Sequence, residues 1–434
     1  MTIGLSAGTA TLLAWVLLVG AGLAGIAIAF APAPTGAGAG RFALRLLAIT
    51  LVALCLRAAL SLLFDGGTYD IFFAYRKLGD ELRRGGDVYA QRLPSLANYP
   101  PVIYWWWSLA ATIVPTGSPH LFAALVRAPF WMIDAAIAPV LALLVRGRWR
   151  WRSAWLYALN PIAIAVPTLH GQFDGIPALC LLLAVAWLAA HPRRAAWLVG
   201  IGTAVKVWPA YFVPALLAGI RRAQWAGFVI RVLVPSVAAF ALYFVIHPDH
   251  IVQGLVGVIA YVPHRQGLGT SLLFPAAWGD PFIVPVDLVV AALVLWLVVQ
   301  CARRDVAVVD IVALVMLIVL GLAPAISDQY LMWPMAILLL GGHRRIAALL
   351  SVAMTPATLF IDISSAGPAF TIPPAAPLLA TAATVTAAAV LLREVWTQGA
   401  TTVPGERSRQ SRAGSPVPAR NAPRKIRGPG RPCT

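Results

Sequence analysis

Charged residues are scarce in this sequence. They make up 11% of its 434 residues, while hydrophobic residues make up 60% and the mean hydropathy is +0.81. Apolar runs long enough to cross a bilayer recur along nearly the whole chain, which is the pattern of a polytopic membrane protein. This composition leaves no stretch for a separate soluble domain.

Acidic residues and lysines are scarcer still. Asp and Glu number 16 against 33 Lys and Arg, which gives a net charge of +17, and the lysines are Lys77, Lys206 and Lys425. The basic residues form short clusters between apolar runs and in the tail, an arrangement that fits membrane topology better than nucleic-acid binding. We therefore expect membrane lipids around the protein and no nucleic-acid partner.

Patterns for disulfides and metal sites are also lacking. Cys55 and Cys180 fall inside apolar segments, Cys301 ends one, and Cys433 lies in the tail, so no disulfide framework is indicated. No metal-ligand spacing is complete, because a single His beside one Asp makes a weak site. We expect neither a metal nor a cofactor.

The apolar runs predict an all-α polytopic integral membrane protein with about 13 transmembrane helices. Residues 1–393 form the membrane domain, and residues 394–434 form a basic, disordered cytoplasmic tail rich in Pro, Arg, Ser and Gly. The expected spans are 9–30, 44–63, 119–145, 153–168, 176–190, 195–205, 208–220, 226–246, 282–300, 306–324, 329–341, 346–361 and 374–392.

Basic clusters orient these spans. The positive-inside rule assigns five clusters and the tail to the cytoplasm, which leaves the N-terminus outside. The clusters are 146–152, 191–194, 221–222, 301–305 and 341–345.

Two segments fit this orientation only if they do not cross the bilayer as single helices. Segment 101–114 is short and rich in Trp and Tyr, which predicts an interfacial or re-entrant helix in the first large external loop. Segment 195–220 should turn back at Lys206, because Pro209 breaks the helix and a buried lysine needs water or an anion.

Five acids gather in the stretch between Phe64 and Val114: Asp65, Asp70, Asp80, Glu81 and Asp87. Asp70 begins an amphipathic segment at the outer interface, where its carboxylate could act as a general base toward a sugar hydroxyl. An equally open alternative makes Asp65 and Asp70 capping or solvated loop acids. The other three are expected to be solvated charges on a helix face.

A cluster of polar residues follows Asn160-Pro161. His170, Gln172 and Asp174 in HGQFDG suit hydrogen bonding to a polyol, although a loop stabilised by its own side chains is the alternative.

Two further groups are candidate ligand contacts. Lys206 and Arg265, the latter beside His264, could bind an anion, although Arg265 could instead contact a lipid headgroup. Asp328, Gln329 and Tyr330 form either a sugar-contacting patch or the polar cap of a span.

Three charged residues lie within or enter apolar runs. We interpret Arg57, Arg127 and Asp134 as buried structural partners rather than catalysts.

The order of these motifs carries a resemblance over roughly residues 44–345. An acidic external loop closes with YPP at 99–101, and NP at 160–161 precedes HGQFD at 170–174, KVWP at 206–209 and DQYLMWP at 328–334. In this order the chain resembles the bacterial GT-C glycosyltransferases that use polyprenyl-phosphate sugars. In outline it is similar to the mannosyltransferases of lipoglycan and GPI-type assembly.

The resemblance implies an inverting, metal-independent transfer of a sugar, mannose by default, to a glycan or glycolipid acceptor. The active site would face the outside of a bacterial plasma (inner) membrane. Asp70 would be the base and Asp65 its alternate, although many relatives carry a closely paired acidic motif where these two acids are five residues apart. Lys206 and Arg265 would hold the leaving phosphate, with His264 beside Arg265. Residues expected to contact the sugar or the acceptor are Tyr99, His170, Gln172, Asp174, Asp328, Gln329 and Tyr330.

Two other functions would require similar polar residues in a membrane protein. A flippase or other transporter of lipid-linked sugars would need a polar path through the bilayer and usually repeat symmetry, whereas the polar groups here cluster on one face. A transferase of the O-antigen ligase or polymerase type, using a diphosphate donor, would favour several arginines in one large external loop. The loop 247–281 contains one arginine, Arg265.

Overall fold

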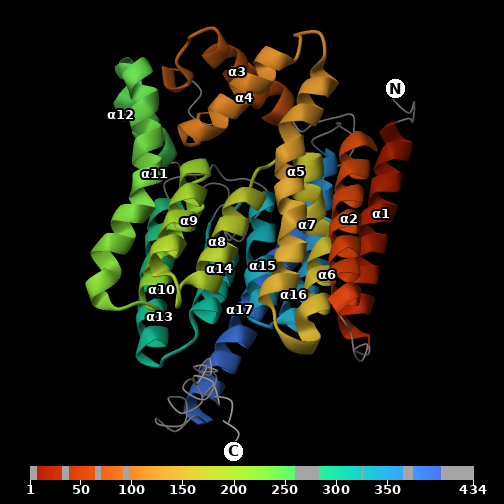
Figure 1. The fold of residues 1–434 in the computed structure, drawn as a ribbon, viewed down its shortest axis with the longest axis vertical. Helices are drawn as coiled ribbons and strands as arrows, with labels where there is room; N and C mark the ends of the chain where they lie inside the picture. The colour runs from red at the N-terminus through yellow and green to blue at the C-terminus, as the bar shows by residue number, and fades with distance from the viewer. Residues whose placement is uncertain are drawn as a thin grey trace, which may run out of the picture.

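The computed structural model describes residues 7–31, 39–63, 70–90, 97–259, 283–324, 326–364 and 375–401. Every regular element of this part of the chain is a helix, and most of the helices stand side by side in a bundle (Figure 1). Helix α1 begins at the end of the bundle where α3 and α4 lie, and α17 ends at the opposite end.

Long apolar helices make this a membrane protein of several passes, as predicted. Within the described residues, 6 helices are long and apolar enough to cross a membrane. The larger predicted number of spans stays a prediction. The six are α1 (Ala7–Phe30), α2 (Ala39–Leu63), α5 (Pro119–Leu144), α11 (Trp225–Ile246), α13 (Ile283–Arg303) and α17 (Ala375–Thr401).

Shorter helices fill the bundle between the long ones. Helices α14 and α15 are apolar on nearly all sides, in keeping with the burial of most of their residues. The shorter elements are α6 (Arg150–Ala158), α7 (Pro161–Ala165), η4 (Val166–His170), α8 (Gly175–Trp187), α9 (Pro192–Val205), η5 (Trp208–Phe212), α10 (Val213–Leu217), α14 (Val308–Leu322), η11 (Asp328–Met332) and α15 (Trp333–Leu340). Helix α16 (Arg344–Ser364) also belongs to the bundle and is less apolar than the six long helices.

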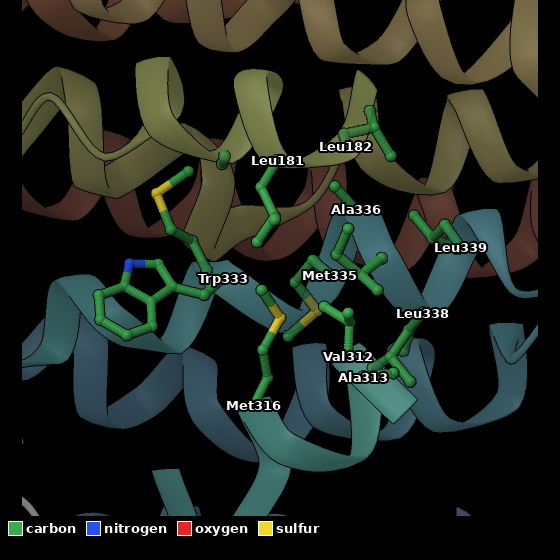
Figure 2. Close-up of a cluster of buried hydrophobic side chains, with 14 of the residues drawn as sticks. Leu181, Leu182, Val312, Ala313, Met316, Trp333, Met335, Ala336, Leu338 and Leu339 are labelled. Atoms are coloured by element: carbon green, nitrogen blue, oxygen red, sulfur yellow. The ribbon is translucent and has the colours of Figure 1, made fainter. Parts of the chain in front are cut away.

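The core lies where α8, α14 and α15 meet. Figure 2 shows Leu181 and Leu182 from α8 facing Met316 of α14 and Met335 of α15. These side chains are almost fully buried, and in a bilayer they stabilise the bundle through close van der Waals packing. Trp333 begins α15 at the edge of this core, so the core fixes its position.

The predicted break at Lys206 is present. Helix α9 ends at Val205, Lys206 is extended with φ −153 and ψ 131, and η5 begins at Trp208. Pro209 has no N–H to continue the α9 hydrogen-bond pattern, which explains why a new helix starts here.

A layer of short helices caps one end of the bundle (Figure 1). Its α4 has 13 residues, too few to cross a bilayer, in agreement with the expected interfacial helix. Helices α3 and α4 pack closely because Gly79 has no side chain, and a Cβ there would lie 2.6 Å from the Trp107 carbonyl oxygen. The layer comprises η1 (Asp70–Tyr75), α3 (Arg76–Arg83), η2 (Val88–Ala90), α4 (Pro101–Ile113) and α12 (Ile251–Ile259).

A buried ion pair joins α2 to α5, as interpreted from the sequence. Arg57 Nη2 lies 2.6 Å from Asp134 Oδ2, and both side chains are inaccessible to solvent. Tyr157 donates a 2.6 Å hydrogen bond to Asp134 Oδ1, so α6 is tied to the same carboxylate. Asp134 therefore serves the assembly of three helices.

Two acids of the first loop are not solvated, and that expectation was wrong. Asp80 is 8% exposed and accepts hydrogen bonds from Arg76 and Arg83 at 2.9 and 3.3 Å. Asp87 accepts a 2.7 Å hydrogen bond from Tyr243 and lies 2.9 Å from His250. Asp87 therefore joins the capping layer to α11, whereas the partners of Asp80 belong to its own helix, α3.

The sequence beyond 393 begins as helix. Helix α17 continues to Thr401. The remainder of the expected tail, 402–434, lies outside the described residues.

Candidate functional site

A cluster of polar side chains lies where the bundle meets the capping layer. Asp70 is the first residue of η1, His170 the last of η4, and Lys206 follows the last residue of α9. Ends of helices carry these groups, so their side chains converge without interrupting the helical hydrogen bonds.

Asp70 is the accessible member of this cluster. His170 Nε2 lies 3.3 Å from Asp70 Oδ2, and Gln172 donates a 3.1 Å hydrogen bond to the same oxygen. The side chain of Asp70 is 37% exposed, compared with 11% for His170. Oδ1 accepts no hydrogen bond from the described residues, which leaves it able to receive a proton from a bound hydroxyl.

Gly171 lets η1 and η4 approach each other. Its φ of +78° lies in the left-handed region, and a Cβ there would be 2.4 Å from Ile71 Cδ1. Ile71 directly follows Asp70. A side chain at position 171 would therefore displace the side chain of Ile71, the neighbour of Asp70.

Arg127 holds η4 in place through hydrogen bonds to backbone carbonyl oxygens. Its guanidinium donates hydrogen bonds to the carbonyl oxygens of Thr168 at 2.8 Å and Ser61 at 3.2 Å. Arg127 is 1% exposed, so these bonds are made in a site closed to water. The interpretation of Arg127 as a buried structural residue is confirmed, and what it supports is the His170 turn.

Lys206 is neutralised by Asp174. Its Nζ lies 2.6 Å from Asp174 Oδ2, and the carboxylate is completely buried. Trp208 and Trp333 donate their indole N–H groups to Asp174 Oδ1 at 3.1 and 2.8 Å. Both oxygens of this buried carboxylate are therefore satisfied.

Aromatic rings surround the Lys206 ammonium. Its Nζ lies 5.0 Å from the ring centroid of Phe173, 5.5 Å from Tyr330 and 5.6 Å from Tyr99. Such distances allow cation–π attraction, which is strongest where water is excluded. The aromatic rings and Asp174 together hold a charge that would otherwise be expensive beneath the surface.

Gln172 connects the lysine to Asp70. Lys206 can only donate, so it faces the amide oxygen Oε1 at 3.3 Å. The amide nitrogen then points toward Asp70. The Asp174–Lys206 pair thus determines which group Gln172 presents to the accessible carboxylate.

The structure brings together most of the predicted ligand-contacting residues. Tyr99, His170, Gln172, Asp174 and Tyr330 lie around Asp70 or Lys206. Gln329 is also buried, and its Oε1 has no hydrogen-bond partner among the described residues. Asp65, His264, Arg265 and the side chain of Asp328 lie outside what is described.

Phe173, Trp208 and Trp333 were not among the site residues predicted from the sequence. The two tryptophans stack with centroids 4.2 Å apart and share Asp174 as acceptor. A signal was present, because both stand immediately before proline in KVWP and LMWP, and a buried indole N–H needs an acceptor.

No group of three His, Cys, Asp or Glu side chains that could hold a metal ion occurs among the described residues. The titratable side chains of the cluster are Asp70, His170, Asp174 and Lys206, of which Asp70 is the most exposed.

Comparison with protein families decides the class. The family model described as Glycosyltransferase family 87 matches residues 98–323, about half of the chain. The chain belongs to glycosyltransferase family 87. No curated protein and no solved structure matches it.

Family 87 is one of the GT-C-like membrane glycosyltransferases, so the resemblance to the GT-C glycosyltransferases is confirmed, while the donor and the sugar stay predictions. The matched part of this family 87 glycosyltransferase includes Tyr99, the His170–Asp174 turn and Lys206. Asp70 and Trp333 lie outside the match, and the fold brings them to the same site.

Proposed function

We propose that this family 87 glycosyltransferase transfers a sugar from a polyprenyl-phosphate donor to a hydroxyl of a glycan or glycolipid acceptor, with inversion. The observation that carries the proposal is the half-exposed carboxylate of Asp70, held by His170 and Gln172 above a buried polar cluster. A fixed carboxylate with one unengaged oxygen suits a general base.

The reaction balances with these groups alone. Asp70 takes the proton of the acceptor hydroxyl as its oxygen bonds to the anomeric carbon of the donor. The bond from that carbon to the phosphate oxygen breaks on the opposite face, and polyprenyl phosphate leaves with the electron pair. Holding both substrates in one site supplies much of the acceleration.

Lys206 has two proposed roles. Its ion pair with Asp174 supports a positioning role, because it holds Gln172 toward Asp70. Direct contact with the donor phosphate stays a prediction for Lys206, as it does for Arg265 and His264. A sugar contact likewise stays a prediction for Asp174, whose carboxylate oxygens already have protein partners.

The distribution of charge supports an extracytoplasmic site in a bacterial inner membrane. Arg148, Arg222 and Arg344 lie at helix ends away from the capping layer that contains Asp70 (Figure 1). Basic residues favour the cytoplasmic side, so the Asp70 end faces outward.

Incubation with a panel of synthetic polyprenyl-phosphate sugars tests the proposal. The purified protein in nanodiscs should release the sugar from one donor, with mannose first in the panel, and convert an acceptor hydroxyl into a glycoside. Free polyprenyl phosphate should appear in equal amount. Movement of an intact donor across vesicle membranes without release of the sugar would contradict the proposal and favour a transporter.

A further inference from the structure

A cluster of arginines surrounds one tryptophan at the end of the bundle opposite Asp70. Trp149 ends the short element η3 (Gly147–Trp149) between α5 and α6. The guanidinium carbon of Arg344 lies 3.2 Å from the centroid of the Trp149 ring system, that of Arg148 4.3 Å and that of Arg152 4.8 Å. Three cations therefore share one indole.

No carboxylate among the described residues pairs with Arg148, Arg152 or Arg344. The charges that act on Arg344 come from Arg152, Arg148 and Arg345, so all of them are repulsive. Arg344 Nε is buried and has no hydrogen-bond partner among the described residues. Arg152 donates to the carbonyl oxygen of Ala31 at the end of α1, which leaves its charge unpaired.

The clustering of cations affects the pKa of Arg344. Burial, together with the neighbouring arginines, lowers the pKa of Arg344 to about 10. Cations gathered without a counter-charge repel one another, and an anion bound between them would remove that repulsion.

The first turn of a helix adds to the positive site. Arg344 is the first residue of α16, a helix of 21 residues. The N-terminal end of a helix carries unpaired N–H groups and the positive end of its dipole, both of which favour an anion.

We infer that the cluster of Arg148, Arg152 and Arg344 around Trp149 binds a phosphate group, presented by the headgroup of an anionic phospholipid. Planar guanidinium groups match phosphate oxygens through paired hydrogen bonds. The inference does not depend on the transferase reaction, because the cluster and Asp70 lie at opposite ends of the molecule.

Aromatic neighbours favour a lipid over a free ion. Phe42 and Trp151 pack with centroids 5.1 Å apart, and Arg150 lies 5.1 Å from the Phe42 ring. Arg45 lies 5.9 Å from the Trp151 ring. Tryptophan and arginine together are typical of the level at which a helix leaves the bilayer, where lipid phosphates lie.

Lipid binding can be measured on the full-length protein. We would add phosphatidylglycerol to the protein in phosphatidylcholine nanodiscs and measure retained lipid by native mass spectrometry and the thermal midpoint. Wild type should retain phosphatidylglycerol in preference to phosphatidylcholine and gain stability from it. Arg344→Gln should weaken retention about tenfold, the effect of losing one charge-assisted contact of about 1.4 kcal/mol.

Matched variants keep the test decisive. Arg222→Gln removes one exposed arginine outside the cluster and should retain lipid like wild type. Arg148→Gln serves if Arg344→Gln does not fold. Equal retention by the wild type and both cluster variants would overturn the inference. Full stabilisation by inorganic phosphate alone, with no preference for phosphatidylglycerol, would overturn the assignment to a headgroup.

Discussion

At the scale of single residues, the site depends on how one lysine charge is held. Lys206 lies between Asp174 and Gln172. Its ion pair with Asp174 orients Gln172, which contacts Asp70. Removal of one partner from a buried pair leaves an uncompensated charge, whereas removal of both does not.

This distinction gives a prediction for Lys206. Lys206→Met should destabilise the protein by about 3 kcal/mol because Asp174 stays buried without its cation. Adding Asp174→Asn should restore much of the stability. Activity should stay low in both variants because Gln172 is no longer oriented.

Thermal unfolding and donor turnover of the two variants provide the measurement. A double variant that recovers activity as well as stability would show that Lys206 serves stability alone. A stable single variant would show that Asp174 does not depend on the lysine charge.

At the scale of elements, the contact between η1 and η4 positions the base. Gly171 combines a positive φ with close packing against Ile71, whereas Gly147 has a similar φ of +71° and open space around its Cβ position. A substitution at Gly147 therefore introduces backbone strain alone, whereas a substitution at Gly171 introduces both strain and a steric clash.

Substitution of these glycines tests the contact. Gly171→Ala should lower turnover at least tenfold, because the added methyl pushes η1 away and lengthens the Asp70–His170 contact. Gly147→Ala should cost about 1 kcal/mol of stability from strain alone and leave turnover unchanged. Equal turnover of the two variants would contradict the role of the η1–η4 contact.

A second element contact predicts a pH dependence. His343, in the turn before α16, lies 2.8 Å from Asp310 and 3.3 Å from Glu394 of α17. Burial opposes the charged ring, but these two carboxylates outweigh it and raise the pKa of His343. A raised pKa in the folded protein stabilises it fully below the unfolded value and less as pH rises through the folded value.

The thermal midpoint should therefore fall by about 1–3 °C as pH rises through the raised pKa of His343. His343→Gln should remove this component of the pH dependence, while His191→Gln, an exposed histidine, should keep it. Calorimetry at several pH values is the measurement. An unchanged pH profile in His343→Gln would show that the histidine does not couple the turn to α17.

At the scale of the whole molecule, hydropathy was sufficient to predict an all-helical membrane protein. The break at Lys206 could also be predicted, because proline and a buried cation are local signals. Trp333 could not be assigned to Asp174, since 159 residues separate them and only packing of α8 against α15 brings them together. Asp87 was misjudged for a similar reason, because its decisive partners, Tyr243 and His250, are far away in the sequence. The partners of Asp80 are local, and its burial follows from the packing of α3.

Sidedness is the property of the whole molecule on which the proposed function depends. In a background without reactive cysteine, Thr116→Cys, in the exposed turn between α4 and α5, should react with a membrane-impermeant maleimide in intact cells. Arg222→Cys should react only after permeabilisation. The reverse pattern would place Asp70 in the cytoplasm and contradict an extracytoplasmic reaction.

The most direct test of the central claim is the rate of sugar transfer by Asp70→Asn. With the donor identified from the panel, this variant should lose transfer by about 10²–10⁴-fold, the contribution of a general base, and still bind the donor. Asp249→Asn, which removes an exposed carboxylate outside the site, should transfer at the wild-type rate. An Asp70→Asn protein that transfers sugar as fast as the Asp249→Asn control would contradict the account.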